Sequence, residues 1–274
     1  MATGRESQAA SALQTDRGLL YGDGVYRTFL HDRAGPRDRD GQFALLARNC
    51  SALAIAAPAP EVLDRAIAQA VAACPDAEQV VRLTVTRGSG PRGYRPPPDA
   101  SPALYVNAGP APPRVAWDAG YRLRHCQLRL GSQPRLAGIK HLNRLENVLA
   151  RAEWDDPTID DGVLLGAAGE VVETVLANLF WRSGDTVFTP ALDRAGVSGR
   201  QRARILEALR DAGAEVLIGH FAADALAAAD EVWVCNSVLG LRAVSAIDGR
   251  ELAPGPTARQ LAATLFGDWQ AEPS

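Results

Sequence analysis

The sequence predicts an α+β (mixed α/β) protein of two subdomains, and three observations support this fold class. Segments in which apolar and polar side chains alternate are interleaved with segments of helical spacing along the chain. Several predicted strands follow one another as hairpins, which argues against strict βαβ units. Proline and glycine cluster at residues 108–115, where few backbone donors are available for a sheet. This cluster marks a linker between a smaller subdomain (1–110) and a larger one (115–274).

In the first half, a strand is expected after the tight turn Gly22-Asp23-Gly24, because the residues that follow this turn alternate. Helical spacing predicts one helix that Pro58 and Pro60 end, and then a second helix. The segment VVRLTVTR alternates cleanly and predicts a half-buried strand. The helices are expected at residues 43–56 and 61–74, and the further strands at 80–87 and 103–107.

The second half mixes strands and helices in the same way. Residues 161–190 predict a meander of hairpins with glycine-containing turns. One helix is expected to end at Gly213, and a capping box formed by Thr257 and Gln260 is expected to open the terminal helix. The remaining strands are expected at residues 121–130, 215–218, 231–235 and 241–247, and helices at 199–212 and 222–229.

Composition and motifs exclude several functional classes. The 274 residues are 47% hydrophobic and 22% charged with a net charge of −3, so no basic surface predicts binding to nucleic acid or membrane. The four cysteines are far apart without a CxxC pair, and the four histidines show no ligand spacing. Neither a disulfide scaffold nor a metal site is therefore expected. An N-terminus without an apolar leader, and no segment of transmembrane length, predict a cytoplasmic protein.

Lys140, in the stretch LAGIKHLNRLENVLAR, is the only lysine of the chain, although lysine and arginine together number 29. Arginine can supply surface charge, but its guanidinium stays protonated and cannot act as a primary amine. A buried lysine can lose its proton and attack a carbonyl. Lys140 is therefore a candidate for Schiff-base chemistry, and the alternative is that it is a remaining surface charge. Helical spacing follows this lysine at Leu142, Leu145, Val148 and Leu149.

Glu173 stands among apolar residues in the predicted strand GEVVETVLANLFW. An unpaired buried carboxylate is costly, so Glu173 either faces solvent or has a cationic partner, and a protonated pyridine nitrogen would serve as that partner. Further along, small residues at 196–199 precede a predicted helix. Such a loop presents free N–H groups at the positive end of the helix dipole, which suits a phosphate, although most loops of this kind are only helix caps.

The segment GSGPRG (88–93) matches the dinucleotide-binding pattern G-x-G-x-x-G. That pattern must open a helix, and here it runs into YRPPP, so a dinucleotide site is rejected. We expect instead a flexible loop with Arg87, Arg92 and Tyr94. The loop is either a solvated surface segment or an anion-binding lid, since arginine can bind a carboxylate through two parallel hydrogen bonds.

Taken in chain order, the lysine, the strand glutamate and the small-residue helix start resemble the fold-type IV pyridoxal-phosphate enzymes. This is the class-IV aminotransferase-like family, with a D-amino-acid aminotransferase-like fold. Within the family, the resemblance is strongest to the 4-amino-4-deoxychorismate lyase group. It rests on YGDGVYRTF, RGSGPRGY, LAGIKHLNRLENVLAR, DGVLLGAAGEVVETVLANLFW, LDRAGVSG and ADEVWVCNS, which span nearly the whole chain after residue 16. The motif KHLNRLE together with RGSGxRGY favours the lyase group over branched-chain and D-amino-acid transaminases.

The resemblance implies pyridoxal 5'-phosphate as the cofactor and a role for each matching residue. Lys140 would form the Schiff base and then serve as the proton-transfer base, while Glu173 would pair with the pyridine nitrogen so that the ring acts as an electron sink. Thr28 would assist proton transfer to the leaving group. By the same resemblance, phosphate-side groups are expected at Val197, Ser198, Asn236 and Ser237, and substrate contacts at Arg92 and Tyr94.

One position departs from the family pattern. The family carries H-x-x-R-L on its first helix, and its arginine holds the cofactor phosphate. Counted from Gly41, this register gives Asn49 and Ala52 here, followed by Leu53. Arg48 lies four residues before Ala52 on the same helical face, and we expect it to reach the phosphate instead.

The implied reaction is a carbon–oxygen bond-cleaving elimination that converts 4-amino-4-deoxychorismate to 4-aminobenzoate and pyruvate for folate synthesis. The resemblance further implies a homodimer with a small-molecule substrate and no nucleic-acid or membrane partner. Two alternatives remain open. One is a class-IV transaminase of small amino acids, either branched-chain or D-amino acids. The other is a non-catalytic relative of the fold, which only the missing helix arginine supports.

Overall fold

The computed structural model describes residues 14–74 and 76–267. The chain forms two compact units. Unit 1 comprises Met1–Pro112 and Ile139–Asn143, and unit 2 comprises Pro113–Gly138 and Arg144–Ser274. The segment that contains Lys140 therefore returns to unit 1 after the chain has entered unit 2, a return that the sequence patterns did not predict. Within the described residues, no helix is long and apolar enough to cross a membrane.

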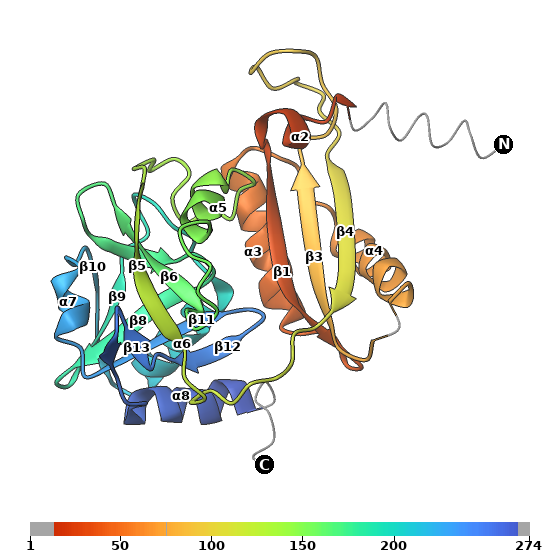
Figure 1. Cartoon of the computed structure of the whole chain (residues 1–274). Helices are drawn as coiled ribbons and strands as arrows, with labels where there is room; N and C mark the ends of the chain where they lie inside the picture. The colour runs from red at the N-terminus through yellow and green to blue at the C-terminus, as the bar shows by residue number, and fades with distance from the viewer. Residues whose placement is uncertain (1–13, 75, 268–274) are drawn as a thin grey trace. The chain divides into compact units, whose positions relative to one another are not determined.

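Unit 1 is built on a four-stranded antiparallel sheet in the order β2-β1-β3-β4, with helices α3 and α4 packed on one face (Figure 1). Its elements in chain order are α2 (Arg17–Tyr21), β1 (Gly24–Asp32), β2 (Gly35–Pro36), α3 (Arg39–Ala52), α4 (Pro60–Ala72), β3 (Gln79–Thr86) and β4 (Ala103–Pro110).

The core of unit 1 follows from strand alternation. Val25 of β1 pairs with Val85 of β3, and Phe29 pairs with Val81, so these side chains share one face of the sheet. All four are fully buried against apolar side chains of α3 and α4. Each such burial contributes roughly 1.5–3 kcal/mol. The expected strand at 80–87 is confirmed as β3, and the opposite face of the sheet carries Tyr26, Thr28 and Arg82.

The longer helices α3 and α4 of unit 1 differ from their predictions at their ends. The expected helix at 43–56 begins earlier, at Arg39, and ends at Ala52. Its end does not depend on Pro58 or Pro60, because the chain turns at Ala54, which has a positive φ of 52°. Pro60 instead starts α4 in its first turn, where a missing N–H costs no hydrogen bond.

Unit 2 contains two mixed five-stranded sheets, with the orders β10-β9-β8-β11-β12 and β14-β13-β5-β6-β7. The hairpins predicted over 161–190 are confirmed as two pairs, β6 with β7 and β8 with β9, but the two pairs belong to different sheets and do not form one continuous meander. The elements are β5 (Arg122–Leu130), α5 (Leu145–Arg151), β6 (Asp161–Gly166), β7 (Val171–Thr174), β8 (Asn178–Ser183), β9 (Thr186–Pro190), α6 (Arg200–Asp211), β10 (Glu215–Gly219), α7 (Asp224–Ala227), β11 (Glu231–Asn236), β12 (Gly240–Ala243), β13 (Ala246–Ile247), β14 (Arg250–Glu251) and α8 (Pro256–Phe266).

The main core of unit 2 contains side chains from both of its sheets. Leu123 of β5 and Val163 of β6 share this core with Leu179 and Trp181 of β8, and all are essentially inaccessible to solvent. Because β6 is buried on both faces, its sequence DGVLLG shows no alternation. The mixed α/β fold class is confirmed by this arrangement of strands and helices.

Two helix predictions in unit 2 are wrong. Helical spacing was expected from Leu142 onward, but the helix begins only at Leu145, because the amide of Leu142 donates to Gly24 O of β1. The capping box expected at the start of α8 does not form either. Gly255 is the N-cap, and the carboxylate of Glu231 accepts hydrogen bonds from the first-turn amides of Thr257 and Ala258.

Candidate active site

Lys140 lies in an extended segment of unit 1 that runs beside β1. The amide of Tyr26 donates to Lys140 O at 2.9 Å, and the amide of Leu142 donates to Gly24 O at 3.0 Å. An antiparallel bridge between Val25 and His141 completes this pairing. Since the backbone on both sides of Lys140 is hydrogen-bonded to β1, the Cα position is fixed and movement is confined to the side chain.

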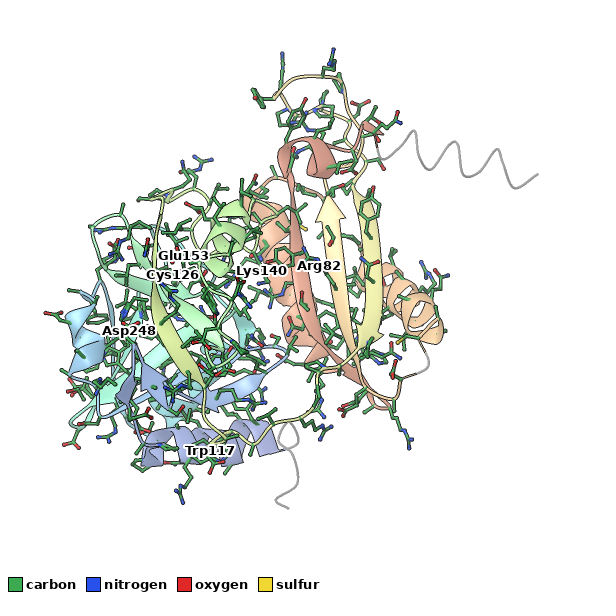
Figure 2. All side chains as sticks on the ribbon, viewed as in Figure 1. Arg82, Trp117, Cys126, Lys140, Glu153 and Asp248 are labelled. Carbon is green, nitrogen blue, oxygen red and sulfur yellow. The ribbon has the colours of Figure 1, made fainter. Side chains whose placement is uncertain are left out.

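The side chain of Lys140 shares an aromatic ring with Arg82. Lys140 Nζ lies 4.6 Å from the centroid of the Tyr26 ring, and Arg82 Cζ lies 4.0 Å from the same centroid. Figure 2 labels both cations on unit 1. A cation over an aromatic face gains electrostatic stabilisation, so Tyr26 holds both charges near one place. The alternation of β3 placed Arg82 on the polar face, but no sequence signal connected that face with Lys140.

Thr28 lies on the same face of the sheet as Tyr26. It is two residues further along β1 and pairs directly with Arg82 of β3. The structure therefore gathers Lys140, Tyr26, Thr28 and Arg82 on the polar face of unit 1, opposite the helices. These groups offer an amine, a hydroxyl and a guanidinium, which can transfer a proton and bind an anion.

Arg48 does not belong to this group. It is exposed on α3, as is Ala52 one turn later, so the helical face that the two residues share is a solvent face. On the same helix, Asn49 is buried, and its Nδ2 has no hydrogen-bond partner among the described residues. The role of Arg48 at the cofactor phosphate stays a prediction.

The loop at residues 88–95, here called the arginine loop, connects β3 towards β4. Arg92 and Tyr94 are exposed on it, and the Tyr94 ring packs edge-on against Tyr21 of α2 at 5.4 Å. Arg87, expected to belong to the same loop surface, is instead buried at its base and donates to Asp23, Leu53 O and Ala54 O. Only two of the three expected side chains are therefore available to a substrate.

Glu173 of β7 is buried in unit 2, with 5% of its surface exposed. Its Oε2 accepts a hydrogen bond from the amide of Val197 at 2.9 Å, and Asn178 Nδ2 lies 3.5 Å from the same atom. The alternative of a solvent-facing glutamate is wrong. A carboxylate held this way keeps a fixed position, which suits a permanent partner of a cationic ring nitrogen.

The small-residue loop before α6 is held to the rest of unit 2 through its amides. Val197 donates to Glu173, Ser198 donates to Gly138 O at 3.1 Å, and Gly199 donates to Asn178 Oδ1 at 3.1 Å. The free N–H groups expected at these three positions are therefore already engaged. Binding of a phosphate here would depend on the Ser198 hydroxyl and on the positive end of the α6 dipole.

Asn178, at the start of β8, was not identified from the sequence. Its Nδ2 donates to Val197 O at 2.8 Å while its Oδ1 accepts from Gly199, so one side chain fixes both ends of the loop. Gly199 lies so close to Asn178 that no larger residue fits at position 199. A Cβ at this position would lie 2.2 Å from Asn178 Oδ1. Asparagine is unfavourable in strands. Its presence in the predicted strand segment ANLFW was therefore a signal that this side chain has a specific role.

Asn236 is the last residue of β11, and Ser237 follows it in a turn of unit 2. Asn236 Oδ1 accepts from the amides of Val238 and Leu239, and its Nδ2 donates to Leu176 O at 3.1 Å. The side chain of Asn236 is thus committed to shaping the turn, and Ser237 is buried beside it. The contribution of this pair to phosphate binding stays a prediction.

The chain matches the family model described as amino-transferase class IV over residues 24–247 and belongs to this family. Members of the family depend on pyridoxal phosphate. Within the described parts of the chain, no three His, Cys, Asp or Glu side chains form a group that could hold a metal ion.

Among its relatives, the chain is 38% identical to the aminodeoxychorismate lyase of Vibrio harveyi, over 86% of this chain and 87% of that protein. It is 30% identical to the aminodeoxychorismate lyase of Bacillus subtilis, over 82% and 77%. Its fold is similar to the crystal structure of 4-amino-4-deoxychorismate lyase from Pseudomonas aeruginosa. That comparison gives a TM-score of 0.86 and 40% identity, covering 94% of this chain and 95% of the other.

Proposed function

We propose that this chain is a pyridoxal-phosphate-dependent lyase that converts 4-amino-4-deoxychorismate to 4-aminobenzoate and pyruvate. The observation that carries the proposal is the placement of the only lysine. Its backbone is fixed on β1, and its amine lies beside Tyr26 on the face that also carries Thr28. The similarity to lyases over most of the chain supports the same reaction.

The residues present fit each end of the cofactor. Lys140 supplies an amine for its aldehyde, Glu173 supplies a buried carboxylate for its ring nitrogen, and the start of α6 supplies a dipole and the Ser198 hydroxyl for its phosphate. Val197, Asn236 and Ser237 shape the phosphate side, and Arg48 is the proposed additional cation. Pyridoxal phosphate, when bound, withdraws electrons from the substrate carbon next to the nitrogen.

The residues of unit 1 would carry out the proton transfers. Lys140 takes the proton from C4 of the substrate, and Thr28 assists protonation of the leaving group. The ether bond between the ring and the enolpyruvyl oxygen breaks, enolpyruvate leaves as pyruvate, and the ring becomes aromatic. Arg92 and Tyr94 would contact the substrate carboxylates. The atoms balance without water, oxidant or keto-acid acceptor.

The proposal is tested by supplying 4-amino-4-deoxychorismate to the holoenzyme and measuring 4-aminobenzoate and pyruvate. We expect equal amounts of both products without any keto acid. Lys140→Ala and Lys140→Arg should each lose about 10³-fold or more of the rate, because the arginine variant keeps the charge but lacks the primary amine. Product formation by either variant at the wild-type rate would refute the role of Lys140. Turnover only with a keto acid would show a transaminase instead.

We also propose a homodimer in the cytoplasm. Leu145, Val148 and Leu149 of α5 are 69%, 61% and 54% exposed, an apolar face suited to a second copy of the chain. All four cysteines are free, which fits a reducing compartment. Sedimentation at twice the 29.1 kDa chain mass would support the dimer, and the single-chain mass would refute it. We further propose that units 1 and 2 are the two subdomains expected from the sequence.

A further inference from the structure

The backbone of the arginine loop is tied to the first helix of unit 1. Arg17, which is 2% exposed, donates to Gly93 O at 2.8 Å and to Tyr94 O at 2.9 Å. The amide of Gly93 donates to the Tyr21 hydroxyl at 3.1 Å. Figure 1 shows this loop beside α2 at the ends of β3 and β4. The loop expected to be flexible is thus anchored, while the side chain of Arg92 stays exposed.

Two arginines at the base of this loop meet one carboxylate, that of Asp23. Arg17 Nε and Arg87 Nε lie 2.9 and 2.8 Å from Asp23 Oδ2, and Arg87 Nη2 lies 3.0 Å from Oδ1. Burial raises the pKa of Asp23, but hydrogen bonds from Arg87 and Arg17 outweigh it and hold the pKa below its usual range. Asp23 is therefore ionised at neutral pH. Its carboxylate binds both Arg87, which precedes the arginine loop, and Arg17, which binds the far end of that loop.

Asp23 also lies in the turn that packs against the Lys140 segment. Gly22 has a φ of +66°, and a Cβ there would lie 2.4 Å from Asn143 Oδ1. A Cβ on Gly24 would lie 2.8 Å from Leu142 Cδ1 and 2.6 Å from a backbone oxygen of β3. Both glycines are needed for this close approach. The triplet Gly22-Asp23-Gly24 thus contacts the Lys140 segment through its glycines, and its aspartate binds Arg87, which precedes the arginine loop, and Arg17, which holds the loop backbone.

We propose that Asp23 is a positioning residue that sets the arginine loop at a fixed distance from Lys140 within unit 1. The inference rests on the proposed lyase function, in which the loop contacts the carboxylates of a small dicarboxylate substrate and Lys140 reacts at its amine-bearing carbon. A substrate that is held by both the loop and Lys140 binds well only when the distance between the loop and Lys140 is constant. The carboxylate of Asp23 is bound by Arg17 and Arg87, so the effect proposed for it acts through these two residues.

The kinetic test compares Asp23→Asn with Asp32→Asn in the holoenzyme. Asp32 is a matched control, because it lies at the other end of β1 and binds Arg37 Nε at 2.9 Å with similar exposure. Asp23→Asn keeps the shape but loses the charge, and we expect KM for the substrate to rise about tenfold while kcat stays within about twofold. We expect Asp32→Asn to leave both constants at their wild-type values.

A second measurement does not depend on activity. The bond between Arg92 and Gly93 is a trypsin site, while Arg95 is followed by proline and resists cleavage. In the wild type both backbone polar groups of Gly93 are hydrogen-bonded, so cleavage needs local opening. We expect Asp23→Asn to yield fragments 1–92 and 93–274 about tenfold faster than the wild type and Asp32→Asn, as read by intact mass.

Equal KM and equal cleavage rates in the two aspartate variants would overturn the proposal. A fall in kcat with unchanged KM would also overturn it, because the Lys140 segment rather than the loop would then depend on Asp23. If Asp23→Asn does not fold, Arg17→Lys replaces it, because Arg17 donates to Asp23, Gly93 O and Tyr94 O from three separate nitrogens, which the single nitrogen of lysine cannot reproduce. A wild type that makes no 4-aminobenzoate would refute the lyase function, while the proteolysis would still decide whether Asp23 holds the loop.

Discussion

In unit 1 the groups proposed for chemistry lie on the accessible face of a sheet, whereas in unit 2 they are buried and hydrogen-bonded. Lys140 is half-buried, its backbone is fixed by β1, and its amine lies beside the Tyr26 ring. Glu173 is 5% exposed, and its carboxylate is fixed by the amide of Val197. Unit 1 therefore presents its reactive side chains on an accessible face, and unit 2 encloses its carboxylate.

This difference matches the tasks that the proposed reaction assigns to the two residues. A group that first holds the cofactor and then carries a proton must change partners, so a mobile side chain on a fixed backbone is required. A carboxylate that keeps a ring nitrogen protonated must stay in one place throughout the reaction, and preorganised charges stabilise a transition state most effectively. The comparison makes a prediction for each kind of residue.

The largest effect is expected from Glu173→Gln, which keeps the acceptor for Val197 and removes the negative charge. We expect kcat to fall about 10²–10³-fold, because a neutral amide no longer favours the protonated ring. Steady-state rates of 4-aminobenzoate formation measure this change. Thermal unfolding should change little, since the side chain keeps its shape and its hydrogen bond.

Glu170→Gln is the matched control for this prediction. Glu170 lies in the same hairpin, where its carboxylate accepts from the amide of Ala168 and lies 3.9 Å from Arg194. We expect Glu170→Gln to leave kcat within about twofold of the wild-type value, because an ion pair of this kind contributes little electrostatic energy. Equal losses in the two variants would show that the buried position of Glu173 has no special electrostatic role.

Much of the fold could be predicted because burial repeats with a regular period. The alternation in β3 identified Val81 and Val85 as core residues, and glycine identified the end of α6 at Gly213. Lys140 and Glu173 were identifiable for a different reason: a sole amine and a buried carboxylate are chemically conspicuous. These signals are local, so they can be read from neighbouring residues in the chain.

Features that depend on distant contacts could not be predicted. Nothing near Leu142 indicates that its amide pairs with Gly24, more than a hundred residues earlier. The helical spacing therefore led to the wrong prediction that the helix includes Leu142. The capping box at Thr257 failed because the distant Glu231 caps α8 instead. Asp23 was interpreted only as part of a turn, because its two arginine partners come together only in the folded unit.

The second prediction concerns the pKa of a carboxylate, which the two units shift in opposite directions. In unit 1 the arginines lower the pKa of Asp23, whereas in unit 2 burial raises the pKa of Asp161 to about 6, despite hydrogen bonds from Thr174 and three backbone amides. Asp161 is fully buried. Its folded pKa exceeds the unfolded value of 3.8, so the native state binds the extra proton between these two values.

Stability contributed by protonated Asp161 is therefore present below about pH 4 and lost as the pH rises to about 6, by about 3 kcal/mol. The free energy of unfolding should be measured for the wild type and Asp161→Asn from pH 4 to pH 7. We expect the difference between them to shift in favour of the asparagine variant across this range. A difference that stays constant with pH would contradict the raised pKa.

The smallest effect is expected from Asn178→Ala, which tests whether the rigidity of unit 2 extends to the loop before α6. The variant loses the hydrogen bonds to Val197 O and from Gly199, each worth about 1 kcal/mol, so we expect affinity for pyridoxal phosphate to fall about tenfold. Absorbance titration of the apoenzyme measures this affinity. Asn147→Ala is the matched control, since its Nδ2 also donates to one backbone oxygen of unit 2, that of Val175 at 3.0 Å. If both variants bound the cofactor as tightly as the wild type, the hydrogen bonds of the loop to Glu173 and Gly138 would be enough to hold it, and the contacts of Asn178 would add nothing to cofactor binding.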